Sequence, residues 1–172
     1  MKGHRYLIEA MSILKGTYPS LRLRVIGQEE NIKVRDLQTI AARLRVNHQI
    51  DFAGFQADVA KAMGECMIGV IPSIGSEAVS RVALEWMASG RPVVATKVGC
   101  LPEIVQPKET GYLVEPKDAP ALAAALAKLL HDPARAEVMG INARAAARGL
   151  FALETFIDKT LAVYKAAIGE LS

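Results

Sequence analysis

The sequence predicts an α/β fold in which a doubly wound parallel sheet carries helices on both faces. Short apolar segments alternate with amphipathic segments of about 10 to 15 residues, which is typical of strands joined by crossover helices. Residues 67–71 (MIGVI) form an almost continuous apolar run, as expected for a strand that is buried on both faces. Gly27, Gly54 and Gly90 close three of these segments and mark turns.

Five strands are expected, at residues 21–26, 49–53, 67–71, 92–96 and 112–114. The first alternates apolar and basic side chains and ends at Gly27, and the second ends at Gly54. The fourth contains two valines and a threonine, and β-branched residues of this kind favour extended backbone. In a doubly wound fold the ligand lies at the carboxyl ends of the strands, so the loops that follow them should contain the site.

Helices are expected before the first strand, at residues 5–15, and between the strands, at residues 32–45, 59–63 and 79–89. In the first of them Leu7, Ile8, Met11 and Leu14 recur at helical spacing. The last ends at Gly90 with a proline soon after it, which is the usual end of a helix.

The C-terminal region is expected to be helical. Asp118 precedes a helix that carries the leucines of residues 122–130, and Asp132 followed by Pro133 opens a second helix. Residues 153–168 predict a third helix with an apolar stripe. We expect both the leucines and this stripe to face the core.

Composition describes a globular chain and excludes several classes of protein. Of 172 residues, 51% are apolar and 23% are charged, which excludes wholesale disorder. The net charge of +3 comes without a basic run, so no nucleic-acid partner is expected. Cys66 and Cys100 predict free thiols in a reducing compartment, and no apolar run approaches the ~20 residues of a membrane span. We therefore expect a soluble, cytoplasmic protein.

The loop and helix of residues 73–96 offer the most chemistry. Glu77 stands just before the predicted helix, whose first amides, from Val79 to Val82, would form an anion site at the positive end of the helix dipole. Glu85 follows eight residues later and can face the same crevice. Such a site suits a sugar nucleotide, with the amides on the diphosphate and the carboxylates on hydroxyl groups. The alternative is that Glu77 is a surface or capping charge and Glu85 a solvated helix residue.

Several motifs, in this order, resemble the retaining glycosyltransferases of family 4. These motifs are E-x7-E (Glu77 and Glu85), MASGRPVVAT (87–96), VGCLPEIV (98–105), GYLVEPKD (111–118) and LAAALAKLLHD (122–132). The likeness covers nearly the whole chain, and it identifies the family more specifically than the substrate.

The resemblance implies that this chain is the donor-binding half of an enzyme with the GT-B architecture, in which each half is a Rossmann-like domain. Such an enzyme transfers a hexosyl unit from a nucleoside-diphosphate sugar with retention, and it needs no bound metal or other cofactor. By position, Glu77 is the implied catalytic residue, Lys2 binds the diphosphate and Glu85 binds the ribose. The implied donor-binding residues are Lys2, Phe52, Gly54, Ser76, Glu77, Ala78, Val79, Ser80, Arg81, Val82, Glu85 and Gly99.

The sequence departs from the family pattern at three places. Val79 and Ser80 stand where the family often has Phe-Gly, and Cys100 replaces a second glycine after Gly99. An arginine that the family carries shortly before Lys2 would fall before the first residue. The last departure removes a phosphate ligand, whereas the first two look tolerable.

Several of these residues also have a structural interpretation. Lys2 is close to a terminus, where fraying is common, and Arg81 is either a phosphate contact or a solvated helix charge. Trp86 favours packing over stacking on a base. No metal site is expected, because the histidines have no partners at ligand spacing; they are His4, His48 and His131.

Other functions stand beside the transferase. A non-catalytic nucleotide-binding or assembly module derived from the same family would share all of these motifs. A dinucleotide oxidoreductase would share the fold, but it needs G-x-G-x-x-G after a strand, and Gly27 is followed by Gln28 and two glutamates. A sugar-nucleotide epimerase would need an acidic and histidine cluster that these loops do not contain.

Residues 1–172 are expected to form a single donor-binding domain from which the N-terminal acceptor-binding domain is absent. Family members are much longer, and in them the first strand of this domain precedes the position of Lys2. In the strand order 3-2-1-4-5-6 that first strand is central, so its absence would leave two unpaired edges. We therefore expect the sheet to close up, to split, or to borrow a strand from a neighbouring chain in a homo-oligomer.

The partners implied by this reading are a nucleotide sugar and either the missing acceptor domain or a neighbouring chain. Alone, the chain is expected to bind a nucleotide sugar weakly and to transfer nothing. Peripheral membrane contact of the full enzyme stays open.

Overall fold

The computed structural model describes residues 2–29, 32–75, 77–150 and 152–169. Its strands are β1 (Leu23–Ile26), β2 (Ile50–Gly54), β3 (Gly69–Ile71), β4 (Val93–Thr96) and β5 (Gly111–Val114). Every strand pair is parallel. The predicted α/β fold with five parallel strands is therefore confirmed.

The strands form two sheets rather than one. β1 pairs with β2, while β3, β4 and β5 form a three-stranded sheet in that order. Splitting is one of the three outcomes expected for a doubly wound order that lacks its first strand, because the remaining strands fall into the groups 3-2 and 4-5-6. β1 and β3 each form one edge of their sheets, and no strand in the described part of the chain lies between them.

The longer helices follow the periodicity of the sequence. They are α1 (His4–Leu14), α2 (Val34–Arg43), α3 (Val59–Gly64), α4 (Arg81–Ala88), α6 (Ala119–His131), α7 (Pro133–Leu150) and α8 (Leu153–Gly169). The sequence did not predict the 3-10 helix η1 (Asn47–Gln49) or the helix α5 (Leu101–Ile104). Both are about one turn long, which is too short to show a periodic pattern.

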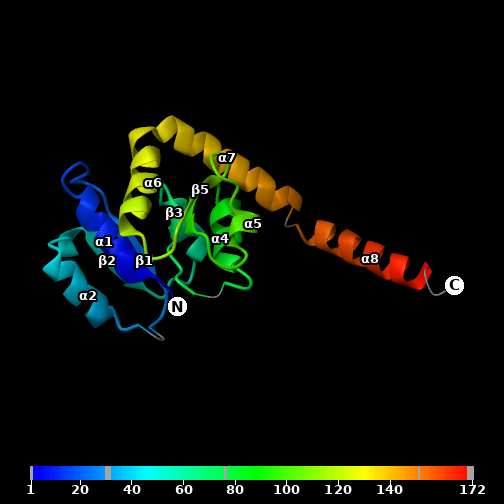
Figure 1. Cartoon of the computed structure of the whole chain (residues 1–172), viewed down its shortest axis with the longest axis horizontal. Coiled ribbons are helices and arrows are strands. Elements are labelled where there is room, and N and C mark those ends of the chain that lie inside the picture. Colours follow the sequence, from blue (N-terminus) through cyan, green and yellow to red (C-terminus); the bar gives the residue numbers. More distant parts are fainter. Residues whose placement is uncertain (1, 30–31, 76, 151, 170–172) are drawn as a thin grey trace.

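Helices cover both faces of the three-stranded sheet (Figure 1). Successive side chains of a strand point to opposite faces, and β4 shows the consequence. Val94 packs with Leu122 of α6 in one apolar cluster, whereas Val93 and Ala95 pack with Met87 of α4 in another. The doubly wound arrangement is confirmed for this sheet.

α1 contacts both halves of the fold. Leu7 and Leu14 pack in the cluster that contains the leucines of α6, which confirms that these leucines face the core. Ile8 packs instead with Leu37 and Val46, beside the two-stranded sheet. The helix that begins the chain therefore connects the two sheets through side-chain packing.

α8 does not bury its apolar stripe, so the prediction that this stripe faces the core is wrong. None of its residues is buried, and Leu153, Phe156 and Tyr164 are 66%, 66% and 63% exposed. Figure 1 shows the helix extending away from the rest of the fold. Periodicity identifies an apolar stripe, but it does not show whether the chain supplies a partner for that stripe.

Candidate functional site

Glu77 lies buried in the loop between β3 and α4, at the carboxyl edge of the three-stranded sheet. Its residue surface is only 6% exposed. The hydroxyl of Ser73 donates a hydrogen bond to Oε1 of Glu77 at 2.5 Å, and the ammonium group of Lys2 forms an ion pair with the same oxygen. Glu77 is therefore not a surface charge. The N-cap of α4 is Ser80, so Glu77 is not a capping residue either.

The backbone of Glu77 is held by the loop that follows β4. The N–H of Cys100 donates to the carbonyl oxygen of Glu77 at 2.9 Å. Gly99 has a φ of +56°, and a Cβ atom at this position would lie 2.2 Å from the same carbonyl oxygen. Only glycine fits such a conformation and such a contact. Cys100, with a φ of −78°, has an ordinary backbone conformation, so the loop tolerates the loss of the second glycine.

Lys2 is placed by the residue that follows it. A Cβ atom at Gly3 would lie 1.9 Å from the carbonyl oxygen of Pro72, so the backbone at Gly3 packs directly on the loop that leads to Glu77. The N–H of His4 also donates to the carbonyl oxygen of Lys2 at 2.9 Å. The structure thus joins Lys2 to Glu77 across 75 residues, while the lysine side chain stays 59% exposed.

The pKa of Glu77 is lowered from its ordinary value. Burial of the carboxyl group raises the pKa, but the hydrogen bonds from Lys2 and Ser73, together with the charge of Lys2, more than offset this effect. The site therefore holds a carboxylate with a cation beside it at neutral pH.

Replacing Glu77 by glutamine should make the stability of the fold less sensitive to acid. A carboxyl group whose pKa is lowered on folding stabilises the fold above its unfolded pKa, near 4.5, and this contribution is lost as the pH falls through the folded pKa. At neutral pH we expect the variant to be less stable by about 1 to 3 kcal/mol, because glutamine carries no charge and cannot form the ion pair with Lys2. Urea unfolding should show that the free energies of unfolding of the two proteins converge as the pH falls. A constant difference between them at every pH would contradict the lowered pKa of Glu77.

The helix that follows Glu77 begins two residues later than the sequence predicted, at Arg81. Hydrogen bonding in its first turn starts with the N–H of Ala83, which donates to the carbonyl oxygen of Ser80 at 3.1 Å. The preceding N–H groups of Arg81 and Val82 lie at the positive end of the helix and can bind an anion. Ala78 and Val79 are exposed in the turn before it, and Ser76 lies outside the described residues.

Glu85 lies on the surface of α4, one helical turn after Arg81. No ion pair or side-chain hydrogen bond of Glu85 is present in the described part of the chain.

Trp86, the neighbour of Glu85, packs on β3, where a Cβ atom at Gly69 would lie 2.4 Å from the indole ring. The packing role expected for Trp86 is therefore confirmed.

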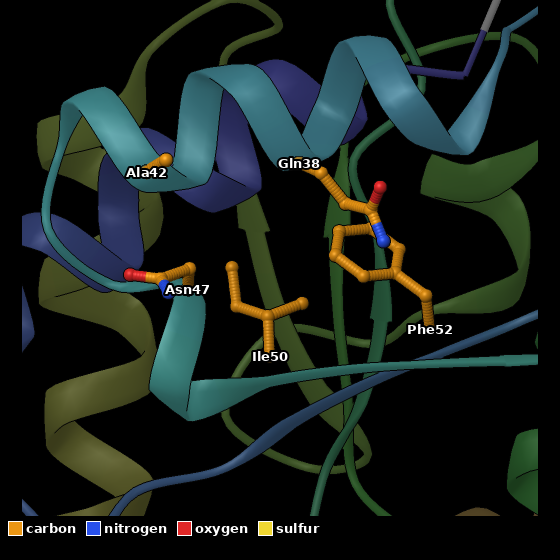
Figure 2. Close-up of a pocket in the computed structure, with 5 residues that line it drawn as sticks. All are labelled: Gln38, Ala42, Asn47, Ile50 and Phe52. Carbon is orange, nitrogen blue, oxygen red and sulfur yellow. The ribbon is translucent and has the colours of Figure 1, made fainter.

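Phe52 and Gly54 lie on the other sheet. Phe52 lines a cavity of about 320 Å³ between α2 and β2, which Gln38 of α2 also lines (Figure 2). Gly54 ends β2 with a φ of +63° and accepts a hydrogen bond from the N–H of Gly27 at 2.9 Å. No described hydrogen bond or ion pair joins either residue to Glu77, so the donor-binding role that the resemblance implies for them stays a prediction.

Thr96 is a polar residue of this site that the sequence analysis did not single out. It is the last residue of β4, it is only 3% exposed, and its hydroxyl donates to the carbonyl oxygen of Ser73 at 2.6 Å. The sequence shows only that a hydroxyl residue ends a buried strand. That Thr96 bonds to Ser73 follows only once the strand beside β4 is known.

Two negative findings concern the part of the chain that the structure describes. It contains no group of three or more His, Cys, Asp or Glu side chains that could hold a metal ion. Its helices are also too short or too polar to cross a membrane.

Sequence comparison relates the chain to known enzymes. The family described as glycosyl transferases group 1 matches residues 1–146. A D-inositol 3-phosphate glycosyltransferase of Segniliparus rotundus is 34% identical over 172 residues, which cover 98% of this chain and 38% of that protein. An MMP α-(1→4)-mannosyltransferase of Mycolicibacterium hassiacum is 37% identical over 116 residues, 67% of this chain and 28% of that protein. The chain thus spans well under half the length of these curated relatives.

Solved structures show the same relationship. Anabaena Alr3699/HepE in complex with UDP superposes with a TM-score of 0.88 at 27% identity, over 96% of this chain and 45% of that one. The C-terminal domain of a group 1 family glycosyl transferase (LpcC) from Francisella tularensis superposes with a TM-score of 0.80 at 31% identity, over 88% of this chain and 80% of that one. On both sequence and fold, the chain belongs to the group 1 glycosyl transferases and corresponds to their C-terminal, Rossmann-like GT-B domain.

Proposed function

We propose that this chain is the donor-binding part of a glycosyltransferase that transfers a hexosyl unit from a nucleoside-diphosphate sugar with retention of configuration. The observation that carries the proposal is the pairing of Lys2 with the buried carboxylate of Glu77 beside the N-terminus of α4. Supporting it, the HepE structures that superpose on this chain hold UDP or UDP-glucose. Among the curated relatives is a phosphatidyl-myo-inositol mannosyltransferase.

The proposed donor site divides the ligand among three groups. The N–H groups at the start of α4 and the ammonium group of Lys2 take the diphosphate, because both offer positive charge. Glu77 takes hydroxyl groups of the hexosyl unit and is the proposed catalytic residue. Glu85 takes the ribose hydroxyls as a bidentate acceptor.

Lys2 has a second role in this proposal, because its partner changes when the donor arrives. Before binding, its charge is balanced by Glu77. A diphosphate carries more negative charge than one carboxylate, and the lysine side chain is 59% exposed and so can turn towards it. The ammonium group then stabilises the charge that develops on the diphosphate as it leaves the sugar.

The acceptor has no proposed place on this chain. Since the chain covers 38% of the D-inositol 3-phosphate glycosyltransferase and 45% of HepE, we propose that acceptor recognition needs a further domain or a neighbouring chain. The isolated chain then binds donor weakly and transfers nothing. Measurable sugar transfer by the purified chain would refute this part of the proposal.

Calorimetry with UDP, GDP, ADP and their sugar conjugates tests donor binding. We expect one nucleotide to bind, and Lys2→Ala to weaken it about tenfold or more, because a charge-assisted hydrogen bond contributes about 1.5 to 3 kcal/mol. Lys165→Ala, which removes an exposed lysine of α8, is the matched control and should bind as the unchanged protein does.

A non-catalytic assembly module derived from this family is the second candidate. The observation that favours it is the exposed apolar stripe of α8, which is typical of a surface that another molecule covers. The same calorimetry distinguishes the two candidates. Folded protein that gives no heat with any of the nucleotides would favour the assembly module.

A further inference from the structure

The carboxylate of Glu77 is held by one of its two oxygens. Both the hydroxyl of Ser73 and the ammonium group of Lys2 donate to Oε1. Neither of these bonds reaches Oε2. The carboxylate is thus fixed at Oε1, and among the described residues no side chain donates a hydrogen bond to Oε2.

Ser73 is itself held by the neighbouring strand. The residue is only 1% exposed, and its carbonyl oxygen accepts a hydrogen bond from the hydroxyl of Thr96 at 2.6 Å. A hydroxyl has one proton to donate, and the carbonyl oxygen of Ile71 lies farther away, at 3.5 Å. The hydroxyl of Thr96 therefore donates its hydrogen bond to the carbonyl oxygen of Ser73. The hydroxyl of Ser73 in turn donates to Oε1 of Glu77.

The two donors to Glu77 differ in how firmly they are placed. Lys2 is largely exposed and, in the function proposed above, is attracted away by the diphosphate. Ser73 is buried and tied to the end of β4. When a donor binds, Ser73 is the group that remains on Oε1 and continues to orient the carboxylate.

We propose that Ser73 and Thr96 are positioning residues that hold Oε1 of Glu77, so that Oε2 is presented to the sugar of the donor. The contact between Oε2 of Glu77 and the sugar rests on the function proposed above. The positioning of Glu77 by Ser73 and Thr96 does not, because those hydrogen bonds are made entirely between residues of this chain.

The first test needs no ligand. The side-chain carboxyl carbon of Glu77 is followed by NMR through an acid titration in ¹³C-glutamate-labelled protein. We expect Ser73→Ala to move the titration to higher pH, because the carboxylate loses a donor. Ser12→Ala removes a hydroxyl that donates only to the carbonyl oxygen of Glu9, and it should leave the titration in place.

Thr96 provides a matched pair for the same measurement. Thr96→Val keeps the shape and removes the hydroxyl, so it should move the Glu77 titration in the same direction as Ser73→Ala. Thr96→Ser keeps the hydroxyl and should restore the titration of the unchanged protein. If Glu77 titrates identically in Ser73→Ala, Thr96→Val and the unchanged chain, the hold does not exist and the proposal is overturned.

The second test uses calorimetry with UDP and UDP-glucose. Ser73→Ala should lower the extra affinity that the glucose unit supplies about tenfold, which corresponds to 1.4 kcal/mol, and should leave UDP binding unchanged. An unchanged preference for UDP-glucose, with a shifted titration, would overturn the sugar contact while leaving the hold supported. If the unchanged protein binds another nucleoside diphosphate instead, the same comparison is made with that nucleotide and its sugar conjugate. If it binds none of UDP, GDP, ADP and their sugar conjugates, the proposed function fails, and the titration alone still decides whether Ser73 and Thr96 hold Glu77.

Discussion

Gly99→Ala is expected to destabilise the fold by about 2 to 5 kcal/mol and to abolish donor binding. Two costs add at this position. The φ of +56° is unfavourable for any residue with a Cβ atom, and that atom would lie 2.2 Å from the carbonyl oxygen of Glu77. Relief of the clash must move the backbone of Glu77, and with it the carboxylate that Ser73 and Lys2 hold. Urea unfolding and calorimetry with the nucleotide that binds would measure the two effects.

Gly54 supplies the matched control for stability. Its φ of +63° is nearly the same, but a Cβ atom there would have nothing within 4 Å. Gly54→Ala should therefore cost only the backbone contribution, about 1 to 2 kcal/mol. Equal losses of stability in the two variants would show that the contact with Glu77 is not tight.

Glu85→Ala should weaken binding of the preferred nucleoside diphosphate by about 10- to 100-fold. The expected loss is about 1.5 to 3 kcal/mol, which is the net contribution of a hydrogen bond to a charged group, because the carboxylate would no longer accept hydrogen bonds from the ribose hydroxyls. Because Glu85 is exposed and lies on the surface of α4, the fold should keep its stability. Calorimetry gives the affinity, and thermal unfolding shows that the variant is folded.

The ligand provides the sharper control for Glu85. A 2′,3′-dideoxy nucleoside diphosphate lacks the groups that the carboxylate would contact, so it should bind Glu85→Ala and the unchanged protein equally. Glu137→Ala removes an exposed carboxylate from α7 and should bind both nucleotides normally. If the dideoxy ligand loses as much affinity as the ribonucleotide on Glu85→Ala, the ribose assignment is wrong.

The fold was largely predictable because its signals are local. Apolar periodicity and closing glycines located all five strands and the longer helices. Counting strands against the doubly wound order left three outcomes open, and the split of the sheet is one of them. The stripe on α8 is apolar, as the sequence predicts, but it is not buried, because burial depends on a partner that periodicity cannot show.

The site was predictable only in outline. The motif resemblance implied that Lys2 and Glu77 share a ligand, but their direct pairing depends on Gly3 packing against Pro72, which is a tertiary contact. The hydrogen bond from Thr96 to Ser73 joins the ends of two neighbouring strands, so no short segment of sequence contains it. Residues that act through another residue's backbone are the hardest to find from sequence.

The split sheet also bears on how the molecule moves. A continuous sheet couples its strands through backbone hydrogen bonds, whereas here the two sheets are joined by side-chain packing, in which both α1 and Leu23 of β1 take part. A small rotation of one sheet against the other would therefore turn α1, and the chain enters α1 through Lys2 and Gly3. Since Gly3 packs on the loop that carries Glu77, such a rotation would act first on the spacing between the ammonium group and the carboxylate. The packing that joins the two sheets therefore lies next to the candidate site.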